Sequence, residues 1–372
     1  MTSISSPGSK RAPCNVYLDL THLGRHVTGI ERVAIELFER RTFEGAVLKP
    51  VRSRGIVSMI LMQQVWLPLL ALFNPSARFV FPGFPPSPLF VFARSRTTLY
   101  VHDLFLITRR PDLSLKARLY MAWPFKFAVS HLQHFLVNSE KTRGELVPFI
   151  RPDATAGLYR PGVRNVFDLD GKRRDARDGA LAPIRIVSVG TVEPRKNYSA
   201  AAAIAARLNM LHKGGAELHI VGRDGWGPDA ERLTGNAHVT VHGFLPAAQA
   251  KAVIERADVY LCTSHDEGLG LPLLEVQYAG LPVVAPDKPV FREVLGSSGT
   301  FVDPSDPDAA AAQILALVSK QGWRQRHAAE AGANVERWNS EAAADAERAR
   351  HMFGEACDKR RTQNAVQTGA TA

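Results

Sequence analysis

Two glutamates eight positions apart, Glu267 and Glu275, stand in a glycine-rich segment that follows an apolar run. The segment, residues 264–284, reads SHDEGLGLPLLEVQYAGLPVV and includes Pro272, a favoured first residue of a helix. Glu267 then lies in a loop, and Glu275 lies in the first turn of the helix. Backbone N–H groups at a helix N-terminus bind phosphate, and carboxylates accept hydrogen bonds from sugar hydroxyls. The segment predicts a sugar-nucleotide site; an acidic cap on an ordinary turn is the alternative.

Two adjacent cations, Arg195 and Lys196, follow the apolar run Ile184–Val189 in the segment VSVGTVEPRKN. A guanidinium that donates two parallel hydrogen bonds, together with an ammonium, suits the negative charge of a diphosphate leaving group. A solvated pair of charges in a loop is the alternative reading.

Metal ligands and disulfides are not expected from this sequence. The cysteines Cys14, Cys262 and Cys357 are far apart and have no zinc-ligand spacing, which favours a reducing compartment. Asp168 and Asp170 have the D-x-D spacing of some metal sites, but they stand in a charged stretch, and we interpret them as incidental. We expect no metal and no other cofactor.

The elements that position these residues alternate between strands and helices in the second half of the chain. The expected strands are Ile184–Val189, Leu218–Val221, Val239–His242, Val259–Cys262, Val283–Ala285 and Thr300–Val302. The expected helices are Ser199–Leu211, Pro246–Ala257, Pro272–Ala279, Val290–Leu295, Asp308–Val318, Trp323–Ala333 and Glu341–Phe353. Such alternation is typical of a parallel sheet covered by helices, which binds ligands beyond the carboxyl ends of its strands.

The first half shows a similar but less regular pattern. Its expected strands are Val16–Leu20, Thr98–His102 and Phe135–Val137, and its expected helices begin near Ile30, Leu115 and Glu140. A length of 372 residues is enough for two domains. We therefore predict a disordered N-terminus (1–14), an N-terminal domain (15–165), a linker (166–183), a C-terminal domain (184–335), a helix that packs back toward the N-terminal domain (336–358) and a disordered tail (359–372).

Positive charge is concentrated in the first half. Residues 1–165 contain 22 Lys and Arg against 10 Asp and Glu, whereas the remainder contains 24 against 26. An anionic membrane surface, nucleic acid and a merely soluble basic surface are the possible reasons. The apolar segment Ile56–Phe73 predicts a buried or interfacial helical hairpin, with Arg52, Arg54 and Arg78 flanking it at headgroup level; a core helix, a membrane-surface element and a full span are the readings left open. Pro68 is expected to break or kink the helix.

Several motifs together resemble the family 4 retaining glycosyltransferases of the GT-B fold. The glutamate segment resembles their E-x7-E motif, and VSVGTVEPRKN resembles their Gly-x-x-x-x-Arg-Lys-Asn loop. LHIVGR (218–223), VHGFLP (241–246), ADVYLCTS (257–264) and FVDP (301–304) follow in the family's order. In the first half, GRHVTGI (24–30), His102-Asp103, Asn138-Ser139 and RPGV (160–163) are similar more loosely. The resemblance implies an α/β fold of two Rossmann-like parallel-sheet domains that face a central cleft.

The resemblance also implies roles for individual residues. Arg195 and Lys196 would contact the donor pyrophosphate, Glu267 the donor sugar and Glu275 the ribose, while His102 would approach the transferred sugar. The catalytic residues would be His102, Glu267, Arg195 and Lys196. The remaining donor contacts would come from loop positions and the base pocket: Gly29, Gly190, Arg223, Gly243, Phe244, Gly268, Leu269, Gly270 and Leu271.

The function implied by the resemblance is a retaining, metal-independent hexosyltransferase. It would use a nucleotide-diphosphate sugar and a lipid-linked or polysaccharide acceptor, at the inner face of the cytoplasmic membrane. Similar members often serve exopolysaccharide, capsule or O-antigen assembly with GDP-mannose or a rhamnose or glucose donor. A nucleotide-sugar 2-epimerase of the same fold and a non-catalytic membrane-peripheral protein are alternatives. No nucleic-acid partner is expected, because the basic half has no recognised motif and no stripe of interleaved aromatic residues.

Overall fold

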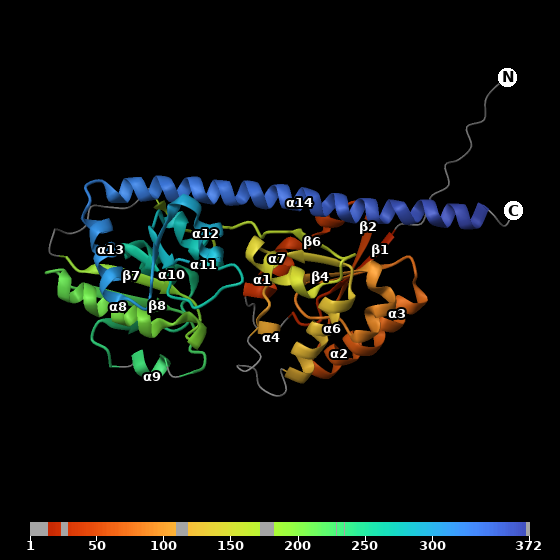
Figure 1. The fold of residues 1–372 in the computed structure, drawn as a ribbon, viewed down its shortest axis with the longest axis horizontal. Helices are drawn as coiled ribbons and strands as arrows, with labels where there is room; N and C mark the ends of the chain where they lie inside the picture. The colour runs from red at the N-terminus through yellow and green to blue at the C-terminus, as the bar shows by residue number, and fades with distance from the viewer. Residues whose placement is uncertain are drawn as a thin grey trace, which may run out of the picture. The chain divides into compact units, whose positions relative to one another are not determined.

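The computed structural model describes residues 14–23, 29–108, 118–171, 182–227, 229–233 and 235–369. The chain forms two compact units, the first made of residues 1–161 and 342–372 and the second of Gly162–Glu341. Each unit contains a six-stranded sheet in which all neighbouring strands are parallel (Figure 1). This confirms the predicted α/β class.

The first unit has the strand order β2-β1-β3-β4-β5-β6. Its strands are β1 (Cys14–Asp19), β2 (Ala46–Val51), β3 (Arg78–Phe81), β4 (Thr97–Val101), β5 (His134–Val137) and β6 (Thr155–Leu158). Its helices are α1 (Gly29–Leu37), α2 (Ile56–Leu61), α3 (Leu67–Phe73), α4 (Phe105–Thr108), α6 (Trp123–His131) and α7 (Glu140–Leu146). Short 3-10 helices are η1 (Arg40–Phe43), η3 (Pro88–Arg96) and η6 (Val147–Phe149), and π-helical turns are η2 (Met62–Trp66) and η5 (Arg118–Ala122).

The second unit has the strand order β12-β11-β10-β7-β8-β9. Its strands are β7 (Ile184–Val189), β8 (Ala216–Val221), β9 (Val239–Val241), β10 (Val259–Leu261), β11 (Val283–Pro286) and β12 (Gly299–Val302). Its helices are α8 (Tyr198–Leu211), α9 (Asp229–Leu233), α10 (Ala247–Arg256), α11 (Leu271–Glu275), α12 (Pro289–Leu295) and α13 (Pro307–Ser319), with 3-10 helices η8 (Pro194–Lys196), η9 (Val276–Ala279) and η10 (Gly296–Ser298). Two apolar clusters form its core, as expected for a sheet buried on both faces.

Three strands of the first unit are absent from the sequence prediction, and all three have weak patterns. β2 is an edge strand that contains Lys49 and Pro50, and an edge strand tolerates proline because one side needs no ladder hydrogen bonds. β3 is only four residues long, and β6 is the opposite edge and contains Gly157. None of the three contains the long apolar run on which the prediction relied, because β3 and β6 are short and Lys49 and Pro50 interrupt β2.

The predicted linker at 166–183 is wrong in its position. The chain passes from the first unit to the second after Pro161, and the described part of the predicted linker belongs to the second unit. Leu169 is buried in the core of that unit, and its N–H donates to Asn165 Oδ1 at 2.7 Å. The Asp170 N–H donates to Glu255 Oε1 at 3.0 Å. One buried leucine among polar residues anchors this stretch; residues 172–181 lie outside the described residues.

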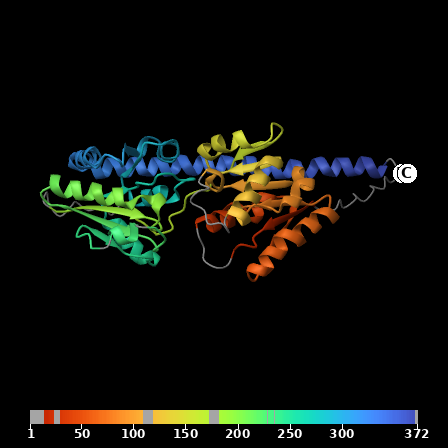
Figure 2. The ribbon, with the colours of Figure 1, turned by 60° about the horizontal axis from the view of Figure 1, so that its bottom comes forward.

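The helical hairpin predicted for Ile56–Phe73 is also wrong. Figure 2 shows one continuous helix, because α2, η2 and α3 follow one another with helical backbone angles at each junction. The Leu67 N–H donates to Met62 O, five residues back, so the helix widens just before Pro68. A π-turn at this place absorbs the hydrogen bond that proline cannot make, and the helix continues.

One long helix, α14 (Trp323–Gly369), replaces the two predicted C-terminal helices and extends into the predicted disordered tail. Residues 334–340, which separate the two predicted helices, contain no glycine or proline, so no helix-breaking residue ends the helix there. Its residues up to Glu341 belong to the second unit and those from Ala342 to the first. In the first unit, Phe353 packs on Phe43 with ring centroids 4.9 Å apart. The predicted disordered N-terminus, apart from Cys14, lies outside the described residues.

Candidate functional site

Three charged side chains from two loops meet in the second unit. Arg195 and Lys196 follow β7, and Glu267 follows β10, so both loops leave the carboxyl ends of neighbouring strands. Lys196 Nζ lies 2.6 Å from Glu267 Oε1, and Arg195 donates to Glu267 Oε2. Ser264 Oγ donates to Glu267 Oε1 at 2.8 Å. Glu267 is 6% exposed, so these residues form a nearly buried ion-pair cluster.

Backbone contacts hold the two loops together. Thr263 Oγ1 donates to the carbonyl oxygens of Lys196, at 3.0 Å, and Asn197, at 2.8 Å. The His265 N–H donates to the Arg195 carbonyl at 2.8 Å. These bonds hold the two loops against each other. The charged side chains are therefore positioned by the loop backbones as well as by their own ion pairs.

Gly190 makes room for the lysine. Its φ of +147° lies in a region that favours glycine. A Cβ atom on Gly190 would lie 3.0 Å from Lys196 Cε and 3.3 Å from Lys196 Nζ. Tyr198 Oη donates to the Gly190 carbonyl at 3.0 Å and fixes this turn. A side chain at position 190 would therefore crowd Lys196, which explains why a glycine stands there.

The cluster keeps its charges. Burial by itself would raise the pKa of Glu267, but Lys196 and Arg195 outweigh burial and the pKa is lowered. Burial by itself would lower the pKa of Arg195, but Glu267 and Glu193 outweigh burial and the pKa is raised above its usual value. Both groups are thus ionised at neutral pH. Arg195 and Lys196 therefore present two positive charges at this end of the sheet, and their ion pairs with Glu267 keep them oriented.

The loop after Glu267 leads directly into α11. Gly270 precedes the helix with a φ of +84°, and Leu271 is the first helical residue. Leu269 is buried, whereas Gly268 and Gly270 are half-buried. Glu275 is buried at the end of α11, and not in the first turn as expected, because the helix starts at Leu271 and is only five residues long.

The predicted base-pocket residues also lie together. The Arg223 guanidinium lies over the Phe244 ring, 4.7 Å from its centroid, and both side chains are exposed. The Gly222 N–H donates to the Gly243 carbonyl at 3.0 Å, which joins the turn after β8 to the turn after β9. An exposed arginine and an exposed ring in contact offer a flat surface on which a nucleobase can stack.

The predicted residues of the first half, His102 and Gly29, lie in the first unit. His102 follows β4, and its Nε2 lies 2.8 Å from the Pro82 carbonyl. A carbonyl only accepts, so Nε2 carries the proton. Burial lowers the pKa of His102 to about 4, and the ring is therefore neutral at pH 7. Gly29 is the first residue of α1, and residues 24–28 of the GRHVTGI segment lie outside the described residues.

Sequence reasoning missed two members of the cluster. Glu193 Oε1 accepts a 2.5 Å hydrogen bond from Arg195, and Ser264 bonds Glu267 directly. Both stand inside the segments that were singled out, three or fewer positions from a predicted residue. Their polar side chains next to charged partners were the only available signal.

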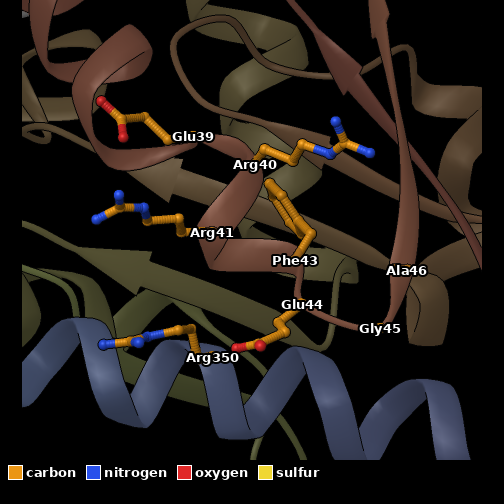
Figure 3. A pocket seen from close by; sticks show the side chains of 8 residues that line it. All are labelled: Glu39, Arg40, Arg41, Phe43, Glu44, Gly45, Ala46 and Arg350. Carbon is orange, nitrogen blue, oxygen red and sulfur yellow. The ribbon is translucent and has the colours of Figure 1, made fainter.

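Among the described residues, no group of three or more His, Cys, Asp or Glu side chains is placed to hold a metal ion. Asp168 pairs with Lys251, with Oδ2 2.9 Å from Nζ. A cavity of about 700 Å³ lies in the first unit, and none of the predicted site residues line it. Figure 3 shows its lining residues, which are Glu39, Arg40, Arg41, Phe43, Glu44, Gly45, Ala46 and Arg350. Ala46 begins β2, so the cavity is at the amino end of that strand, where parallel sheets rarely bind their substrates.

The family model of the glycosyl transferases group 1 matches residues 173–335, which include the whole ion-pair cluster. The match shows that this segment is similar to the group 1 glycosyl transferases. The chain is 32% identical over 142 residues to the O-antigen chain mannosyltransferase B of Escherichia coli, a match that covers 37% of each chain. A phosphatidyl-myo-inositol mannosyltransferase of Mycolicibacterium smegmatis is 32% identical over 154 residues, which cover 40% of this chain and 39% of that one. The chain thus spans well under half the length of these curated relatives.

Solved structures resemble the chain over most of its length. A sucrose-phosphate synthase from Thermosynechococcus elongatus has a TM-score of 0.66 at 14% identity, over 92% of this chain and 100% of that one. WaaG, a glycosyltransferase involved in lipopolysaccharide biosynthesis, has a TM-score of 0.61 at 14% identity, over 91% and 99%. These likenesses concern the fold, and together with the two parallel sheets they confirm the GT-B fold expected for a group 1 glycosyl transferase.

Proposed function

We propose that the protein is a glycosyltransferase that moves a hexose, with mannose as the first candidate, from a nucleotide-diphosphate donor to a glycan acceptor. The observation that carries the proposal is the cluster of Arg195, Lys196 and Glu267 at the carboxyl ends of β7 and β10. Mannose is supported by the similarity to the mannosyltransferases of Escherichia coli and Mycolicibacterium smegmatis.

Each residue of the cluster has a task in this proposal. Arg195 and Lys196 stabilise the charge that develops on the departing nucleoside diphosphate. Glu267, held ionised by these cations, accepts hydrogen bonds from hydroxyls of the donor sugar. Arg223 and Phe244 border the base, Glu275 binds the ribose, and the loop before α11 supplies N–H donors to the phosphates. His102, neutral with its proton on Nε2, keeps a lone pair on Nδ1 toward the reacting sugar.

A panel of GDP-, UDP-, dTDP- and ADP-sugars in a thermal-shift assay tests the donor. We expect GDP-mannose to raise the melting temperature most. The shift should be measurable, because a ligand at 100 times its dissociation constant stabilises the folded protein by about 2.7 kcal/mol. The variant Arg195→Ala/Lys196→Ala serves as the control and loses this shift. If no nucleotide sugar stabilises the wild-type protein or is turned over by it, the proposal is wrong.

The finer features of the reaction follow from the same family. We propose that the anomeric configuration of the sugar is retained and that no metal ion takes part, because two cations already serve the diphosphate. NMR of the product's anomeric proton tests retention. Turnover that persists after exhaustive treatment with EDTA is the expected result for a metal-independent reaction, and turnover restored only by a divalent cation contradicts it.

The acceptor is proposed to be lipid-linked or polysaccharide, used at the inner face of the cytoplasmic membrane by a protein bound peripherally. Among the described residues, one helical segment is long and apolar enough to cross a membrane, Ile56–Phe73, and 22% of it is buried. Its Gln63, Leu67 and Ala71 are buried in the first unit, whereas Val57 and Phe73 are 72% and 75% exposed. A helix with one side packed in a core is suited to lying on a bilayer.

Neighbouring elements enlarge this apolar surface. α3 contacts η3, and η3 contacts α6. Exposed apolar side chains on these elements include Leu89 and Phe92 on η3 and Trp123 on α6. The exposed Arg52 and Arg54 precede the helix and suit anionic headgroups.

Liposome co-sedimentation tests the membrane proposal. Binding to anionic vesicles is expected to weaken with salt, because the screening length falls from about 10 Å at 0.1 M to about 3 Å at 1 M. Val57→Asp/Phe73→Asp should abolish binding, while Met210→Asp, at an exposed position in the second unit, should leave it unchanged. Equal co-sedimentation of the double variant and the wild type would refute the proposed surface.

A further inference from the structure

A second polar cluster, which the donor chemistry does not use, lies at the carboxyl end of β1 in the first unit. Asp19 is the last residue of β1 and is 2% exposed. Its carboxylate accepts hydrogen bonds from the Thr21 N–H at 3.0 Å, from Thr21 Oγ1 at 2.6 Å and from Gln63 Nε2 at 3.0 Å. Gln63 reaches it from the apolar helix described above. The carboxylate is therefore fixed in one position at the end of the strand.

His22, three residues after Asp19, has no such partners. Both ring nitrogens are shielded from solvent, and neither has a hydrogen-bond partner among the described residues. The ring lies against Phe84, with ring centroids 5.1 Å apart. A Cβ atom on Gly83 would lie 2.8 Å from His22 Nε2, so the absence of a side chain at Gly83 creates the space for the ring. Buried polar atoms are almost always paired, and two unpaired ones on a single ring indicate a missing partner.

The charges around His22 restrict what that partner can be. Asp19, whose pKa is raised by burial, and Glu31 both raise the pKa of His22, so two carboxyl groups face the ring and disfavour an anion. Burial lowers the pKa of His22 although the two carboxylates oppose it, which favours the neutral ring at pH 7. A neutral imidazole has one N–H donor and one acceptor nitrogen. A hydroxyl group is both an acceptor and a donor and carries no charge, so it matches the ring where a phosphate does not.

The cluster also lies beside the histidine of the candidate active site. His102 Nε2 bonds the Pro82 carbonyl and His22 lies against the adjacent Gly83, and both histidines follow the carboxyl ends of strands in one parallel sheet. Burial and, to a lesser degree, the charge of Asp19 raise the pKa of Tyr120, whose side chain is 37% exposed. The His22 side chain as a whole is only half-buried, so part of the residue is open to solvent.

We propose that His22 binds a hydroxyl group of a neutral acceptor sugar, and that Asp19 and Glu31 make this subsite unfavourable to phosphorylated or otherwise anionic acceptors. The inference rests on the proposed glycosyltransferase function and assigns the chemical class of its acceptor end. His22 is a binding residue in this scheme, Asp19 acts through its field, and Gln63 and Thr21 hold Asp19.

Imidazole NMR of the full-length protein observes the residue directly. The ring signals of His22 are assigned by their loss in His22→Gln. Methyl α-D-mannopyranoside should shift these signals, and inorganic phosphate should not. His134→Gln, at a half-buried histidine that begins β5, a strand separated from β1 by β3 and β4, should leave the response intact. A response to phosphate instead of the mannoside, or to neither, would overturn the proposal.

Kinetics separates this subsite from the donor site. With a mannoside acceptor, His22→Leu should raise the acceptor KM at least about tenfold, because a buried polar contact is lost. Donor KM and donor hydrolysis without acceptor should stay unchanged, and His22→Gln, which keeps a donor and an acceptor, should recover part of the loss. Unchanged acceptor KM in His22→Leu contradicts the subsite. Failure of the proposed function has a different signature, since the wild type would then neither bind nor hydrolyse any nucleotide sugar.

Discussion

Replacing Glu267 by glutamine should destabilise the second unit strongly. The change keeps the shape of the side chain but removes the charge shared by Lys196 and Arg195. Removing one partner of a buried ion pair costs about 3–5 kcal/mol. Glu193 still neutralises Arg195 in the variant, and the Lys196 side chain is 13% exposed, so we expect the lower limit of about 3 kcal/mol.

A calorimetric scan of the full chain measures this effect. The second unit contains about 180 residues, for which 1 kcal/mol corresponds to about 2–4 °C, so its transition should fall by about 6–12 °C. Glu255→Gln is the matched control. Glu255 lies in the same unit, its side chain is partly exposed, and its ion pair with Lys251 is long, with 3.8 Å between Oε1 and Nζ. That exposed pair is worth at most about 1 kcal/mol. A Glu267→Gln transition within about 2 °C of the wild type would refute the assignment of a buried, charged cluster.

The dependence on pH provides a second test of Glu267. Its pKa is lowered in the folded protein, so the carboxylate stabilises the fold above the unfolded pKa of about 4.3. This contribution is lost as the pH falls through the folded pKa. Below that pH the wild type and Glu267→Gln should converge in stability, and a difference that persists in acid would contradict the charge-based explanation.

Three further predictions concern the donor site, the first unit and the active-site histidine. Arg195→Ala/Lys196→Ala should lower turnover by at least about 10²–10³-fold while circular dichroism stays unchanged, and near wild-type turnover would remove both residues from the diphosphate. Asp345→Asn should destabilise the first unit by about 3 kcal/mol, because the fully buried carboxylate accepts hydrogen bonds from Arg160 Nη1 at 3.0 Å and from the Arg160 N–H at 3.2 Å. The double variant Asp345→Asn/Arg160→Met should recover part of this loss. Denaturant titration measures both variants. The pKa of His102 is lowered to about 4 from an unfolded value of about 6.5, so the folded state loses stability as the pH falls between these values, and His102→Asn should flatten that slope in a pH series of melting curves.

The strands of the second sheet were determined by local sequence alone. β7 was predicted with its observed bounds, and the five other strands of this sheet to within two residues at either end, because strands buried on both faces are continuous apolar runs between polar loops. The residues of the candidate donor site were likewise visible as motifs. What those motifs did not contain was the pairing of Lys196 with Glu267, which lie 71 positions apart in the chain. Only the parallel alignment of β7 with β10 brings them together.

Tertiary structure alone decided the features of the first unit. Gln63 was visible as a polar interruption of an apolar helix, but its contact with Asp19 depends on how that helix packs against β1. The unpaired ring of His22 and the opening at Gly83 have no local signature at all. The position at which the chain passes between units was also decided by packing, since Leu169 and Phe167 pack on the core of the second unit from a mostly polar stretch. Local patterns report whether a residue is buried, whereas the partner it meets depends on how distant segments pack, and the chemistry of the site depends on those partners.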